Sequence, residues 1–143
     1  MARIRHELNR GAIHVLLRSP AGPVARDMLR RGLRVESAAK RNLAGASGKP
    51  RRIDTGLLRS SVSTKLVIVG GLPAARIGSG VRYAKLVHDG TGIYGPRRTR
   101  IRARTGKVLR FRPKGSNRWV FRASVKGMRP NEYLADALPA ARD

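Results

Sequence analysis

Apolar residues recur at helical spacing in the first third of the chain. In residues 3–18 they are three or four positions apart, and this spacing predicts an amphipathic helix. The breaker-rich segment 19–23 ends it, and residues 24–46 repeat the pattern, which predicts a second helix before a loop at residues 45–50. The apolar positions of the two helices are Ile4, Leu8, Ala12, Val15 and Leu16, then Val24, Met28, Leu29, Leu33, Val35, Ala39 and Leu43.

The middle of the chain changes to a strand pattern. Asp54 or Thr55 is expected to cap a short helical turn that carries Leu57 and Leu58. Residues 62–69 are rich in β-branched side chains and predict a strand, which the turn at 70–73 connects to a partner strand at 74–78. Residues 81–87 then predict a short helix that ends at 88–92. Its inward side chains are expected to be Tyr83, Ala84, Leu86 and Val87.

Arginines alternate with other residues over positions 98–104, so a strand there would carry a row of arginines on one face. After a turn at 105–106, residues 108–112 and 118–124 predict two strands joined by the loop 113–117. We expect their apolar side chains on one face and their arginines on the other. The apolar set is Leu109, Phe111, Trp119 and Phe121.

Residues 130–141 predict a final helix with Pro130 in its first turn. Its inward side is expected to carry Tyr133, Leu134, Ala137 and Leu138. The predicted fold class is therefore α+β: N-terminal helices and a C-terminal helix packed on an antiparallel β-sheet, with a basic β-hairpin extension. We predict a single domain over residues 1–143, with a helical N-terminal region at 1–46 and a basic β extension at 97–126, called the basic extension below.

Composition sets limits on this picture. A chain of 143 residues can bury a core without disulfides or a metal, and it has no cysteine. No apolar run is long enough to span a membrane, and residues 1–7 lack the apolar region of a signal peptide. We therefore expect synthesis in the cytoplasm and no membrane contact.

The charge is extreme and uneven. Lys and Arg number 32 against 8 Asp and Glu, which gives a net charge of +24, and no acidic residue lies between Asp89 and Glu132. A protein of this charge repels itself unless a polyanion neutralises it, and arginine suits bidentate phosphate contacts. The expected polyanion-facing residues, called the nine extension cations below, are Arg98, Arg100, Arg102, Arg104, Lys107, Arg110, Arg112, Arg118 and Arg122.

Three occupants of this basic face are open: DNA, an acidic neighbouring protein, or solvent. Phosphate contacts give affinity without sequence reading, which favours non-specific contact with double-stranded DNA. Trp119 and Phe121 are expected in the core, which argues against the stacking surfaces of single-strand binders.

Candidate catalytic patterns are weak. The triplet Asp54, Thr55 and Gly56 matches an aspartic-protease loop, but that chemistry needs a second carboxylate and an apolar flank, whereas arginines surround this triplet. His88 and Asp89 lack the further ligands that a metal site needs, and no phosphate-binding Gly-rich loop with Lys-Ser/Thr is present. We expect no enzyme, no metal and no cofactor.

Three segments in order resemble one family. The first holds Asp54, Thr55, Gly56, Leu58 and Ser61. The second holds Tyr83, Ala84, Gly90 and Thr91, and the third holds Pro130, Tyr133, Leu134 and Leu138. Together they resemble the minor neck and tail-completion (head–tail joining) proteins of long-tailed bacteriophages, over about residues 25–141. The family often has Glu-x-Gly-Thr where this chain has His88, Asp89, Gly90 and Thr91, so the acid is displaced by one position.

The resemblance implies a structural role. Such proteins are α+β subunits without a catalytic role, and they assemble in the head–tail joint, often as rings around the DNA passage. It implies a homo-oligomeric ring, a hexamer or a dodecamer, with neck, portal-side or tail-tube and terminator proteins as neighbours, and location in the virion after synthesis in the host cytoplasm. A non-specific nucleic-acid-binding protein of ribosomal or nucleoid type is the alternative, and it rests on charge alone.

Overall fold

The computed structural model describes residues 8–46, 48, 51–52, 54–113 and 115–142, and it confirms the predicted α+β class. The described helices and strands, in chain order, are α1 (Arg10–Arg18), α2 (Pro23–Leu43), α3 (Leu57–Ser61), β1 (Val62–Val69), β2 (Leu72–Ser79), α4 (Ala84–Asp89), the 3₁₀ helix η1 (Gly92–Tyr94), β3 (Ile101–Arg102), β4 (Leu109–Phe111), β5 (Val120–Arg122), β6 (Ser124–Val125) and the 3₁₀ helix η2 (Ala135–Ala141).

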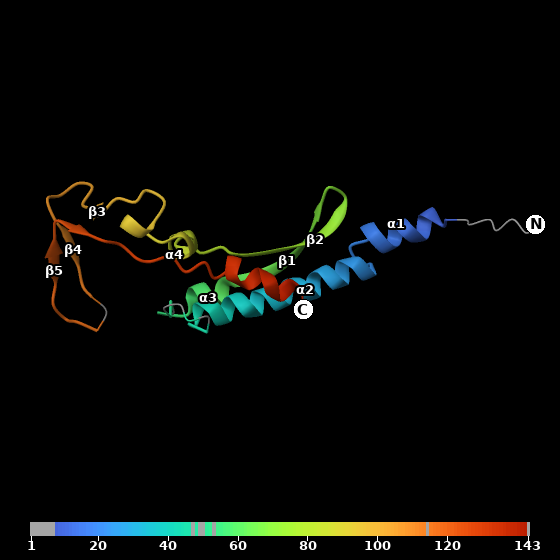
Figure 1. Cartoon of the computed structure of the whole chain (residues 1–143), viewed down its shortest axis with the longest axis horizontal. Coiled ribbons are helices and arrows are strands. Elements are labelled where there is room, and N and C mark those ends of the chain that lie inside the picture. Colours follow the sequence, from blue (N-terminus) through green and yellow to red (C-terminus); the bar gives the residue numbers. More distant parts are fainter. Residues whose placement is uncertain (1–7, 47, 49–50, 53, 114, 143) are drawn as a thin grey trace, which may run out of the picture.

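The long helix α2 lies against one face of the β1–β2 hairpin, and η2 packs beside α2 (Figure 1). The hairpin register pairs Val62 with Ser79 and Val69 with Leu72, around the turn at Gly70 and Gly71. Alternate side chains share a face, so the register sets a row of residues toward α2 that includes Thr64 and its partner Ile77. The predicted hairpin is thus confirmed, with a partner strand slightly longer than expected.

The core gathers residues from distant parts of the chain. Buried side chains from α2 meet those of α3, β1, α4 and the C-terminal segment in one cluster. Its members are Val35, Ala38, Ala39, Leu43, Leu58, Val62, Ala84, Val87, Tyr133 and Ala137. Asn42 is also buried, and its side-chain amide donates a 3.2 Å hydrogen bond to the carbonyl of Tyr133. The C-terminal segment is therefore an integral part of the core.

Helix α1 covers part of the first predicted helix. It begins after Asn9, whose side-chain oxygen accepts a 2.9 Å hydrogen bond from the amide of Ala12. The earlier part of the prediction, residues 3–7, lies outside the described residues. Although α1 contacts α2 and β2, it buries none of its residues, and Val15 and Leu16 are exposed.

The basic extension lies at the opposite end of the long axis from α1 (Figure 1). The described strands do not form one continuous sheet; they form three separate two-stranded antiparallel sheets, β1–β2, β3–β6 and β4–β5. Residues 98–104 do not form one strand either: β3 contains only Ile101 and Arg102, and Arg98 has a φ of 49°. The expected row of arginines on one strand face is therefore absent there.

The register of β4 and β5 overturns the predicted separation of apolar and basic side chains. Leu109 pairs with Arg122, Arg110 with Phe121, and Phe111 with Val120. Directly opposite residues point to the same face, so Phe121 shares a face with Arg110. Trp119 and Phe121 are exposed rather than in the core.

Two further helix predictions were wrong in detail. Helix α4 begins at Ala84, three residues later than expected, and Tyr83 and Leu86 are exposed, although Ala84 and Val87 are buried as predicted. The final helix is a 3₁₀ helix that starts at Ala135, so Pro130 precedes it.

Candidate polyanion-binding surface

Two antiparallel backbone segments fasten the basic extension to the body of the molecule. The amide of Thr91 donates to the carbonyl of Met128 at 2.8 Å, and the amide of Ile93 donates to that of Lys126 at 2.9 Å. The Thr91 hydroxyl also accepts a 2.9 Å hydrogen bond from the amide of Met128. Gly92 and Gly127 lie in these segments, and a Cβ on either would clash with backbone atoms of the other segment. The extension therefore has a narrow, tightly packed base.

All nine extension cations are exposed. Strands β3 and β6 hold Arg100 close to the sheet, where its Nε donates a 2.9 Å hydrogen bond to the Ser124 hydroxyl. The cations face more than one direction, since the β4–β5 register puts Arg110 and Arg122 on opposite faces of the hairpin. They form a basic surface around the extension instead of the single row that alternation predicted.

Trp119 is the centre of a cation–π cluster on the β4–β5 hairpin. The guanidinium carbon of Arg110 lies 4.1 Å from the centroid of its ring, and that of Arg112 lies 5.0 Å from it. Both distances are within the range of a favourable cation–π interaction. The sequence predicted Trp119 on the opposite face from these arginines and therefore missed the cluster; pairing Phe111 with Val120 would have revealed it.

A groove of about 710 Å³ lies where the extension leaves the body. The groove is lined by Gly90 and Thr91 of the second family-like segment and by Arg100 and Arg102 of the extension. Leu86 adds apolar surface to this lining. Part of the family-like sequence thus lies next to part of the basic surface.

The three family-like segments converge in the core. Leu58 comes from the first segment, Ala84 from the second and Tyr133 from the third, and all three are buried in the same cluster. The amide of Asn131 donates a 2.9 Å hydrogen bond to the carbonyl of Val87, which joins the second and third segments directly. Gly90 has a φ of 78°, and a Cβ there would lie 2.9 Å from the Met128 carbonyl oxygen.

The remaining motif residues divide between structural and exposed positions. The Ser61 hydroxyl lies 2.6 Å from that of Ser79, which ties the start of β1 to the end of β2. Leu134 packs against the core, whereas Leu138 is 61% exposed, so its predicted inward position is wrong. Leu138 is therefore available for contact with another molecule.

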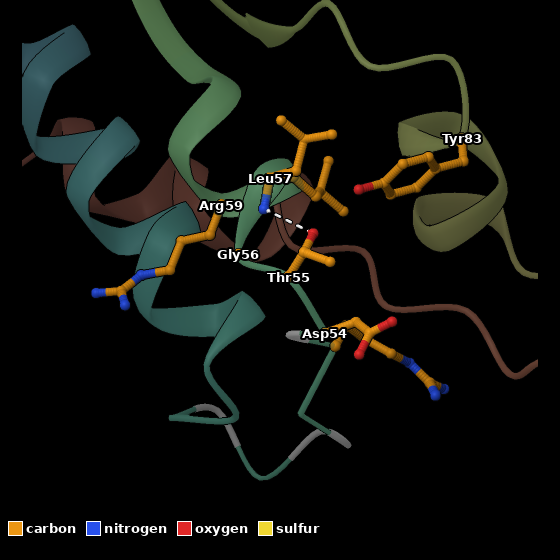
Figure 2. Close-up of a pocket in the computed structure, with 8 residues that line it drawn as sticks. Asp54, Thr55, Gly56, Leu57, Arg59 and Tyr83 are labelled. Atoms are coloured by element: carbon orange, nitrogen blue, oxygen red, sulfur yellow. Dashed lines mark hydrogen bonds between the residues drawn. The ribbon is translucent and has the colours of Figure 1, made fainter. Parts of the chain in front are cut away.

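The first motif forms one wall of a shallow cavity of about 300 Å³. Figure 2 shows Tyr83 pointing toward Leu57 across this cavity. The Thr55 hydroxyl accepts a 3.4 Å hydrogen bond from the Leu57 amide, while Gly56 occupies the cap position of α3. The predicted cap by Asp54 or Thr55 is therefore wrong, because Gly56 is the N-cap residue and no side chain among the described residues caps α3. The turn leads into a helix, unlike a protease loop held between buried strands.

Electrostatic contacts around α4 support its C-terminal end. Asp89 accepts from Lys85 Nζ at 2.6 Å and lies 2.9 Å from His88 Nδ1, and these contacts, with that to Lys85 the stronger, hold the pKa of its carboxyl below the ordinary range. The His88 ring packs edge-on against Tyr133, with 5.6 Å between centroids. His88 and Asp89 therefore support the fold, and no group of three or more metal-ligating side chains occurs among the described residues.

Comparisons with family models, with curated proteins and with solved structures give no match for this chain. Within the described ranges, no helix has the length and apolar character needed to cross a membrane.

Proposed function

We propose that this protein is a structural subunit of the head–tail joint of a long-tailed bacteriophage, a neck or tail-completion ring that surrounds the DNA passage. The observation that carries the proposal is the convergence of Leu58, Ala84 and Tyr133. These residues come from the three family-like segments, which are far apart in the sequence. Their meeting in one core supports reading the segments as parts of one fold rather than as three unrelated short motifs.

In the proposed ring, the basic extension contacts the phosphates of double-stranded DNA without reading its sequence. Support comes from the exposure of all nine extension cations and from the separation of the extension from the core. Sequence-independent phosphate contacts let a protein slide along the duplex, which suits a passage through which DNA moves. Exposed Leu138 and the exposed apolar residues of α1 are the proposed contacts with neighbouring subunits or with adjoining neck and tail proteins.

The test is removal of the gene from the phage genome that encodes it. The proposal expects filled heads and separate tails in lysates viewed by negative staining, and rescue of joined particles when the protein is supplied in trans. Joined, infectious particles without the protein would overturn it.

The exposed cations also favour a second candidate, a non-specific nucleic-acid-binding protein of ribosomal or nucleoid type. This candidate expects tight binding by free monomers at physiological salt. Light scattering combined with gel shifts separates the two: the joint protein assembles into a closed ring, whereas the alternative coats nucleic acid as a monomer.

A further inference from the structure

We propose that the β4–β5 hairpin binds unpaired nucleic-acid strands by stacking a base on the exposed part of the Trp119 ring, with Arg110 and Arg112 contacting the adjoining phosphates. The inference rests on the part of the proposed function that assigns DNA contact to the basic extension. It specifies the form of nucleic acid that this hairpin prefers.

The register places the required groups together. Arg110 is directly opposite Phe121, and both guanidinium groups of Arg110 and Arg112 lie against the Trp119 ring. One face of the hairpin therefore combines two aromatic rings with two cations. Because these guanidinium groups cover part of the Trp119 ring, the base would stack on the ring surface that remains exposed, with the two cations left to contact phosphate.

Both rings are open to solvent. Trp119 is 49% exposed and Phe121 is 57% exposed. Their side chains take no part in the buried core cluster. Large aromatic side chains on a two-stranded hairpin gain little from folding when left exposed, so they are suited to contact with another molecule.

The chemistry of the hairpin narrows that molecule. Its cations, Lys107, Arg110, Arg112, Arg118 and Arg122, come from a part of the sequence that has no acidic residue. The ligand must therefore carry dense negative charge and also present flat apolar surfaces. Unpaired nucleic acid supplies both in each nucleotide, and base–aromatic stacking tolerates any sequence.

Strand preference separates stacking from simple charge attraction. Duplex DNA has the higher charge density, so phosphate contact alone favours the duplex over a single strand. In the duplex, the faces of internal bases are already stacked and are closed to Trp119. A preference for single strands thus requires a contribution from the rings.

Trp119 is the only tryptophan of the chain, so its fluorescence reports directly on the proposed site. The full-length protein is titrated with an oligothymidylate, with a duplex of equal length, with inorganic polyphosphate and with polyglutamate. We expect strong quenching by the oligothymidylate and tighter binding to it than to the duplex, with weak quenching by polyphosphate.

Variants are compared by the anisotropy of a labelled oligonucleotide. Trp119→Ala is expected to weaken single-strand binding roughly 5- to 150-fold, the range for loss of one base stack, and to weaken duplex binding much less. Trp119→Phe should keep most of the affinity. Phe111→Ala is the matched control because Phe111 points to the other face of the hairpin, and we expect a change of less than about twofold, as for a ring outside the stack.

The outcomes are distinct. Equal binding of single and double strands, unaffected by Trp119→Ala, overturns the inference and leaves the proposed duplex contact intact. Binding to neither form, with quenching by polyglutamate, overturns both DNA contacts and makes an acidic protein the partner of the extension.

Discussion

Gly92 and Gly127 face each other across the two segments at the base of the basic extension, and neither position has room for a side chain. A Cβ on Gly92 would lie 2.9 Å from the Gly127 Cα, and one on Gly127 would lie 2.7 Å from the Gly92 nitrogen. Both residues also have positive φ, 65° and 91°. The attachment of the extension therefore depends on two glycines that are 35 residues apart in sequence (127 − 92).

Gly127→Ala is expected to loosen this base because backbone strain and the clash act together, at a cost of about 1–3 kcal/mol. The amides of Thr91 and Ile93, which bond across the base, should exchange hydrogen faster. Gly115→Ala is the control: it shares the positive φ, 79°, but has open space around it. Unchanged exchange at both amides in Gly127→Ala would contradict the importance of the close approach.

The triple variant of Arg100, Arg102 and Arg104 to Ala should keep its fold and bind duplex DNA more weakly. The slope of log affinity against log salt is expected to fall by about 0.9 for each phosphate that the variant no longer neutralises. Arg30, Arg34 and Arg41 on the exposed side of α2, changed together to Ala, remove the same charge elsewhere. Equal weakening in both variants would mean that net charge, not the extension, determines binding.

Leu58 and Leu138 belong to the same family-like pattern but should behave differently. Leu58 is 3% exposed, so Leu58→Ala is expected to lower the free energy of unfolding by about 2–5 kcal/mol. Leu138 is 61% exposed, and Leu138→Ala should change stability by less than about 0.5 kcal/mol. Urea denaturation measures both. Sedimentation of Leu138→Ala then tests whether this leucine joins neighbouring subunits, since a proposed contact residue should weaken assembly when truncated.

Gly32→Ala is expected to have two opposing effects on stability, because Gly32 lies where α2 packs on the hairpin. Alanine normally favours a helix over glycine by about 1 kcal/mol. Here, however, the new Cβ would lie 2.6 Å from Thr64 Cγ2 and 2.8 Å from Ala75 Cβ. Overpacking of this kind costs about 1–3 kcal/mol, so net destabilisation is expected in thermal unfolding. Thr64→Ser removes the clashing methyl group and should restore part of the stability; no restoration would mean that the clash is elsewhere.

Tyr133 is expected to make the free energy of unfolding change with pH in the alkaline range. Burial raises the pKa of its hydroxyl above the ordinary value of 10.0. Its contribution is therefore fully present below pH 10.0 and is lost as the pH rises from there through the folded-state pKa, because the unfolded chain ionises first. In Tyr133→Phe this part of the pH dependence should disappear from denaturation curves measured between neutral and alkaline pH. An identical pH dependence in both proteins would exclude Tyr133 as its source.

Local patterns were sufficient for the longest elements. Helix α2 has many turns of consistent apolar spacing, and β1 has a run of β-branched residues next to a two-glycine turn, so both were predicted nearly within their bounds. Burial of Ala84, Val87 and Tyr133 also followed from spacing. These features are determined by residues that are close in sequence.

The site was harder to predict because its geometry depends on pairing. The alternation of apolar and basic residues within β4 and within β5 was predicted correctly. Which side chains of the two strands share a face depends on the register, however. Phe111 pairs with Val120 and not with Phe121, so the apolar face of β4 lies on the same side as Arg122 of β5. The predicted row of arginines at residues 98–104 was wrong because Arg98 has a positive φ, which the alternation of residue types does not reveal. The inward position predicted for Leu138 was wrong because η2 is a 3₁₀ helix. A 3₁₀ helix has about 3.0 residues per turn instead of 3.6, so the residues that share a face differ from those of an α-helix.

The bond from Asn42 to the Tyr133 carbonyl spans 91 residues and has a consequence for biosynthesis. The ribosome makes α1 and α2 first, then the hairpin, then the whole basic extension, and only afterwards the residues that cover Asn42 and complete the core. Throughout that interval the nascent chain carries both the exposed arginines of the extension and an unfinished hydrophobic core. On the proposed function, the extension would be able to bind RNA before the core is complete, and co-expression with a competing polyanion should then raise the yield of folded protein.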